Sequence, residues 1–151
     1  MIYRAVLAVL LASALLGATL PALDDARRER ASMTVAEQAE TLERTARRLA
    51  RTDDPTADAG ARRIVTLSLP ASDRTTAAVD RLSVGPASGD AGGRIRWHVR
   101  GGSTHEAMLS GPRLGTTDGE PLALDGPGRH RLVLALDGRP DSPVVTVRRL
   151  K

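Results

Sequence analysis

The stretch AVLAVLLASALLGATL, Ala5–Leu20, contains sixteen consecutive uncharged residues. Because it is apolar on every side of a helix, it predicts a helix that lies in lipid rather than one that packs on a protein core. From Ile2 to Leu23 the segment has 22 residues, about 33 Å of helix, which is enough to cross a hydrocarbon core of ~30 Å. Two interpretations stay open: an uncleaved membrane anchor, or a secretory signal with Met1–Arg4 as its basic start. Leu20-Pro21-Ala22 is a poor cleavage site for a signal peptidase. We therefore favour the interpretation that residues 1–23 form an uncleaved membrane anchor.

The charges beside this segment bear on its orientation. Arg4 precedes it, and three arginines at 27, 28 and 30 follow it, diluted by neighbouring acidic residues. A simple count of positive charges places the following domain inside the cell. A short N-terminal tail before a β-rich domain is, however, the usual layout of an exported protein. We therefore expect a single-pass protein of the cell membrane whose C-terminal domain is extracellular.

A second apolar pattern follows in residues 24–52 and predicts an amphipathic helix. Thr34-Val35-Ala36-Glu37 is a capping-box pattern, which predicts a helix start at Thr34. Whether residues 24–33 extend the helix back to the membrane, with a kink at Pro21, stays open. The apolar stripe fits either packing on the chain's own sheet or packing on a neighbouring subunit. It consists of Val35, Ala39, Leu42, Ala46 and Leu49.

Beyond a linker at 53–61, the apolar period changes from 3.6 residues to two, which predicts strands over residues 62–151. The expected fold class is α+β: a transmembrane helix, an amphipathic helix, and a small antiparallel β-sheet domain of five to seven strands. Gly101-Gly102 is expected to form a two-residue hairpin turn. The expected strands are Ile64–Leu69, Val79–Val84, Arg94–Arg100, Ser103–Leu109, Pro121–Leu124, Arg129–Leu136 and Val144–Leu150.

The composition excludes several classes of site. The chain has 151 residues, no cysteine, one tryptophan, one tyrosine and a formal net charge of +4. Disulfides, thiolate metal sites and cysteine nucleophiles are therefore absent. Folds that bind nucleic acid by stacking its bases need several aromatic side chains, so we expect no nucleic-acid partner. Residues 129–151 contain six basic and two acidic residues, which places the net charge at the C-terminal end.

Two sets of residues are candidates for binding. In the predicted hairpin His98 lies opposite His105, at a separation that would allow the two rings to share a metal ion. No third ligand is predicted, so a solvated polar face is the preferred interpretation and no metal or other cofactor is expected. An arginine-rich sheet face is the second candidate, suited to an anionic ligand in the cell envelope. Its residues are Arg94, Arg96, Arg100, Arg129 and Arg131.

Catalytic patterns are not evident. No general base is predicted to lie near the hydroxyls of Ser72 and Ser103. The glycine-rich segment Gly89–Gly93 lacks the lysine and the serine or threonine of a phosphate-binding loop. We therefore expect a protein that is not an enzyme.

Several segments along nearly the whole chain resemble a small haloarchaeal family of unknown function: LPALDDAR at 20–27, ARRIVTLSLP at 61–70, VDRLSVG at 79–85, PGRHRLVLAL at 127–136 and the VVTVRRL ending. The order of apolar helix, proline, amphipathic helix and antiparallel sheet also resembles the layout of a type IV pilin. Genes of the family are thought to lie among those for pilus-like secretion machinery. The resemblance implies a pilin-like surface component, with the membrane and other pilin-like or secretion subunits as its partners.

Overall fold

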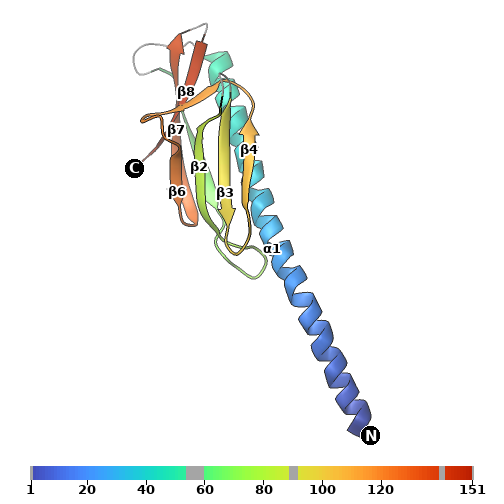
Figure 1. The fold of residues 1–151 in the computed structure, drawn as a ribbon. Helices are drawn as coiled ribbons and strands as arrows, with labels where there is room; N and C mark the ends of the chain where they lie inside the picture. Colours follow the sequence, from blue (N-terminus) through green and yellow to red (C-terminus); the bar gives the residue numbers. More distant parts are fainter. Residues whose placement is uncertain (1, 54–59, 89–91, 140–141, 151) are drawn as a thin grey trace.

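The computed structural model describes residues 2–53, 60–88, 92–139 and 142–150. A single helix, α1 (Ile2–Thr52), precedes two four-stranded sheets (Figure 1). The strands are β1 (Arg62–Leu69), β2 (Val79–Pro86), β3 (Gly93–Val99), β4 (Thr104–Leu109), β5 (Arg113–Thr116), β6 (Leu122–Asp125), β7 (Gly128–Arg139) and β8 (Ser142–Arg149).

The strands divide between sheet A, in the order β1-β7-β8-β5, and sheet B, in the order β4-β3-β2-β6. All neighbouring strands are antiparallel except β5 and β8, which pair in parallel. The α+β class with an N-terminal apolar helix and a mainly antiparallel β domain is confirmed, but the structure has eight described strands rather than five to seven. The unexpected strand is β5, which has only four residues and no regular apolar alternation, so its sequence gives little signal.

The inward rows of the two sheets and one side of α1 form a common core. In β3 the burial alternates as expected, with Ile95, Trp97 and Val99 buried, and in β7 the alternate residues from His130 to Leu136 are buried. The predicted stripe of α1 is buried throughout, and Leu42 and Leu49 are 0% exposed. The helix therefore packs on its own domain, which was one of the two interpretations of the stripe.

The helix does not begin at Thr34. It runs without interruption from Ile2 through Pro21 to Thr52, a length of about 77 Å. The Thr34 hydroxyl donates to the carbonyl of Arg30 at 3.0 Å, a bond that a residue inside a helix makes. The capping-box interpretation is wrong because the residues before Thr34 are already helical. Most of the expected linker, residues 54–59, lies outside the described residues.

Two side chains of α1 attach it to the sheets by hydrogen bonds. Ser32 accepts from the indole N–H of Trp97 at 3.2 Å, in a buried position. The amide of Gln38 pairs with both backbone groups of Ser68 on β1. Gln38 thus occupies the place of a neighbouring strand at the free edge of sheet A, an edge that would otherwise expose unpaired backbone groups.

Candidate functional site

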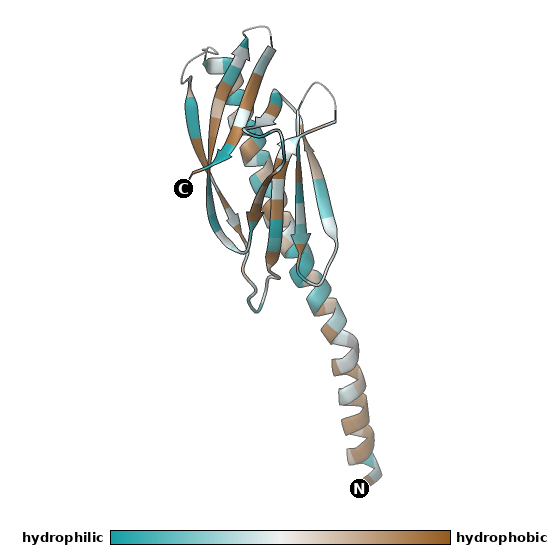
Figure 2. Ribbon diagram, turned by 60° about the vertical axis from the view of Figure 1, so that its left-hand side comes forward, coloured by the Kyte–Doolittle hydropathy of each residue, from teal (hydrophilic) through white to brown (hydrophobic). Residues whose placement is uncertain are grey.

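The N-terminal half of α1 extends beyond the sheets as a bare apolar rod (Figures 1 and 2). It contains an apolar stretch long enough to cross a membrane, none of which is buried in the protein. Leu7 and Leu11 are 68% and 62% exposed, in contrast to the stripe further along the same helix. Length and composition make this segment a candidate membrane span. The helix enters the domain near Arg27 and Arg28, where its first half-buried side chains occur.

Arg27 lies where the bare rod meets the domain and contacts the loop between β1 and β2. Its backbone carbonyl accepts from the N–H of Ala77 at 3.1 Å, and its guanidinium donates to the carbonyl of Asp73. The Asp73 carboxylate in turn accepts from the backbone N–H and hydroxyl of Thr75 and from the N–H of Thr76. These bonds, the backbone N–H of Thr75 foremost, hold the pKa of Asp73 below its usual value.

The two candidate metal ligands do not share a face. His98 pairs in register with Thr104, and His105 pairs with Trp97. Between β3 and β4 the chain uses a turn one residue longer than expected, in which Gly101 has a φ of +70° and Gly102 N–H donates to the carbonyl of Val99 at 2.9 Å. A shift of one residue moves every side chain of the returning strand to the opposite face.

The expected pairing of His98 with His105 is therefore wrong. The His105 ring stacks on Trp97, with ring centroids 5.6 Å apart, whereas His98 lies among arginines on the outer face. Within the described residues, no group of three or more metal-ligating side chains comes together.

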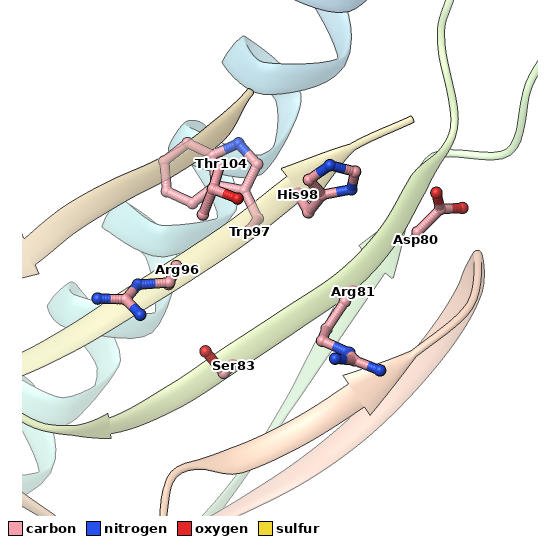
Figure 3. A pocket seen from close by; sticks show the side chains of 7 residues that line it. All are labelled: Asp80, Arg81, Ser83, Arg96, Trp97, His98 and Thr104. Atoms are coloured by element: carbon pink, nitrogen blue, oxygen red, sulfur yellow. The ribbon is translucent and has the colours of Figure 1, made fainter. Parts of the chain in front are cut away.

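The outer face of sheet B contains a shallow groove of about 480 Å³. Figure 3 shows its side chains along β2 and β3, with Thr104 from β4, and Arg81 and Arg96 extend in different directions. It is lined by Asp80, Arg81, Ser83, Arg96, Trp97, His98 and Thr104.

Acidic neighbours neutralise most of the arginines of sheet B. Arg96 donates two hydrogen bonds to Glu106, at 2.8 and 3.1 Å, from the opposite position on β4. Arg100 donates two to Asp80, at 2.6 and 3.0 Å. Arg81 donates to Asp125 of β6 at 2.8 Å. Only Arg94, among the described residues, has no carboxylate partner on this face.

Arg129 and Arg131 belong to a different surface from Arg94, Arg96 and Arg100. They are exposed on the outer side of β7 in sheet A, opposite Ser68 and Thr66 of β1. The expected single arginine face is therefore divided between the outer faces of two sheets. Sequence periodicity cannot reveal this division, because it assigns residues to the inside or outside of a strand but does not assign strands to sheets.

Sequence reasoning missed the residues that fix the helix to the domain. Ser32 and Gln38 were not singled out, although both lie on α1 within one turn of the apolar stripe. A polar residue beside an apolar stripe is a weak signal for such a role, because most such residues are solvated. The buried indole N–H of Trp97 was a better signal, since a buried tryptophan usually has a hydrogen-bond partner.

A family model described as "Domain of unknown function (DUF7311)" matches residues 2–150. The chain belongs to this family. The match includes the apolar helix and both sheets, so the DUF7311 domain comprises the candidate membrane span together with the folded part. The expectation of an uncharacterised family is confirmed at this level. No curated protein matches the chain, and no solved structure matches it.

Proposed function

We propose that this DUF7311 protein is a non-enzymatic, single-pass membrane subunit that holds an exported, pilin-like domain, as part of a pilus-like or secretion assembly. One observation carries the proposal. A single helix of 51 residues is bare and apolar over its first half and forms part of the domain core over its second half.

The continuity of α1 supports a structural role. The rod and the core helix are joined without a break, so the position of the domain is fixed relative to the anchor. A flexible linker would leave the domain free to reorient on the membrane, whereas a subunit of an ordered assembly needs a defined geometry. The hydrogen bonds of Ser32 and Gln38 to the two sheets maintain that geometry.

The bare rod also suits contact with other apolar helices. Within lipid, helices associate where small residues allow their backbones to approach closely. The exposed segment contains Ala8, Ala12, Ser13 and Gly17 among its leucines and valines. The absence of an enzyme activity belongs to the proposal as well.

Photocrosslinking in native membranes tests the assembly role. The chain has no cysteine, so Leu15→Cys places a single thiol on the rod for a benzophenone maleimide. We expect adducts with other membrane proteins, identified by mass spectrometry. Met33→Cys, exposed on the same helix beyond the rod, is the matched control and should give a different set of adducts. If Leu15→Cys and cysteines placed on the other sides of the rod gave adducts with lipid alone, the assembly role would be overturned.

Thiol labelling tests the export of the domain. Thr117→Cys is exposed and distant in sequence from the anchor. In intact cells, a membrane-impermeant maleimide should label it as fully as in lysed cells. Labelling only after lysis would place the domain inside and overturn the exported orientation.

A further inference from the structure

The outer face of sheet A contains a group of exposed arginines that lack acidic partners among the described residues. Strand register aligns its side chains in rows. Ser68 lies beside Arg129 and Thr66 beside Arg131, while Ile64, Val133 and Arg148 form the next row. Arg62 of β1 and Arg113 of β5 also lie on the outer side of sheet A. Among the described residues, none of these five arginines has a carboxylate within ion-pair distance, and Asp137 is the only acid in these rows.

This balance concentrates positive charge on one face. With Arg139, which continues the outer row of β7, six arginines and one aspartate give the described part of this face a net charge of +5, against +4 for the whole chain. Elsewhere, acidic residues therefore exceed basic ones by one. Sheet B illustrates the difference, since three of its four outer arginines are bound to carboxylates.

The arginines are spaced regularly around an apolar centre. Val133 is only 4% exposed although it belongs to the outer row, with Ile64 and Arg148 opposite it in register. Arg129 and Arg131 are two residues apart on one strand, so about 7 Å separates their backbone positions. Arg148 lies diagonally from Arg131 at about 7–8 Å. A guanidinium binds carboxylate or sulfate through two parallel hydrogen bonds, so these positions offer repeated anion contacts.

We propose that the outer face of sheet A, centred on Arg129, Arg131 and Arg148, binds a linear anionic polysaccharide that carries carboxylate or sulfate groups. A repeating polymer matches the row of unpartnered arginines. The site goes beyond the assembly role, and the choice of a carbohydrate of the envelope rests on the exported orientation proposed above.

Two other polyanions fit less well. The strands of sheet A run along the domain beside α1, in the general direction of the rod (Figure 1). When the rod crosses a bilayer, the face therefore points sideways and not toward lipid headgroups. Nucleic acid is disfavoured because the face has no aromatic side chain for stacking bases, and Trp97 is buried in sheet B.

The test measures binding of the full-length protein, in detergent or nanodiscs, to heparin, to polygalacturonate and to neutral dextran. We expect the wild type to bind the two anionic polymers in a salt-sensitive manner and not to bind dextran. The triple variant Arg129→Gln/Arg131→Gln/Arg148→Gln should lose at least tenfold in affinity. A control with the same change in net charge, Arg81→Gln/Arg94→Gln/Arg96→Gln on sheet B, should lose less than threefold.

Several outcomes would overturn the proposal. Equal losses in the two triple variants would mean that overall charge, not this face, causes binding. Binding by the wild type that is tighter to duplex DNA or to anionic vesicles than to both polysaccharides would assign the face to another ligand. The proposal would also be refuted if the wild type bound neither heparin nor polygalacturonate. Circular dichroism establishes that each variant is folded, and the crosslinking and labelling experiments are independent of this result.

Discussion

The two halves of α1 are one continuous helix in two different environments. Over residues 2–23 every side chain that the structure describes is exposed, whereas from Ala31 to Leu49 one narrow side is buried against both sheets. The boundary lies at Arg27 and Arg28, where the loop before β2 contacts the helix. The comparison teaches that apolar content alone does not identify a core helix. The angular width of the apolar surface separates a helix for lipid from a helix for a protein core.

The largest expected effect is a difference in domain stability between substitutions in the two halves of α1. Leu42→Ala removes a fully buried side chain and should lower the free energy of unfolding by about 2–5 kcal/mol, because it loses apolar burial and leaves a cavity. Leu11→Ala makes the same change on the bare rod and should leave unfolding of the domain unaltered. Urea titration in detergent, followed by the fluorescence of the one tryptophan, measures both. Equal destabilisation by the two variants would contradict the division of the helix.

A smaller effect tests the polar attachment of the second half. Ser32→Ala leaves the buried indole N–H of Trp97 without its acceptor, which should cost about 1–3 kcal/mol of unfolding free energy. Ser13→Ala, on the rod, is the matched control and should have no effect on unfolding. Because Trp97→Phe removes the only tryptophan, urea titration followed by circular dichroism measures these variants. If the bond is responsible, adding Trp97→Phe to Ser32→Ala should not add the full cost of each change. Strictly additive losses of unfolding free energy in the double variant would contradict a role for the hydrogen bond between Ser32 and Trp97.

The smallest effect concerns the boundary itself and depends on pH. Asp73 has a lowered pKa in the folded protein, so the charged carboxylate is the form that stabilises its loop. This contribution is present above the ordinary carboxyl pKa of about 4 and is lost as the pH falls through the lowered folded value. Exchange of the Thr75 and Thr76 amide hydrogens should therefore gain extra acceleration at acid pH, beyond the intrinsic change in exchange rate.

Asp73→Ala should expose both amides at neutral pH and abolish the additional acid effect. Asp118→Ala, an exposed aspartate in another loop, is the control and should leave the exchange of Thr75 and Thr76 unchanged. Protection that persists in Asp73→Ala would show that other contacts hold the loop to Arg27.

Much of the architecture could be predicted from local patterns. The rod, the stripe of α1 and the alternation in β3 and β7 follow from periodicities of 3.6 and two residues, and the structure has each of them. The strand β5 was missed because four residues are too few to establish a period. Thr34-Val35-Ala36-Glu37 was misread because a capping box and a turn in the interior of a helix can have the same composition.

The candidate binding residues were the least predictable. The expected pairing of His98 with His105 was wrong because the turn after Val99 is one residue longer than expected. Strand register in a hairpin depends on the length and conformation of the turn, which the patterns of the two strands do not reveal. Arg94, Arg96, Arg129 and Arg131 lie on the outer sides of their strands as expected, whereas Arg100 lies in the turn after β3. Their partners were not evident, because Glu106, Asp80 and Asp125 reach Arg96, Arg100 and Arg81 from other strands or across a turn.

The sequence by itself determined that the chain has a helix long and apolar enough to span a membrane, an amphipathic continuation of it, and a β-rich domain. These features depend on residues a few positions apart, whose spacing in a helix or strand is fixed by backbone geometry. The tertiary structure alone decided that the strands form two sheets and that His98 and His105 face opposite ways. It also decided that three of the four outer arginines of sheet B are paired, whereas those described on the outer face of sheet A are not. Those outcomes depend on strand pairing between distant segments, where a shift of one residue or a change of neighbour alters every contact.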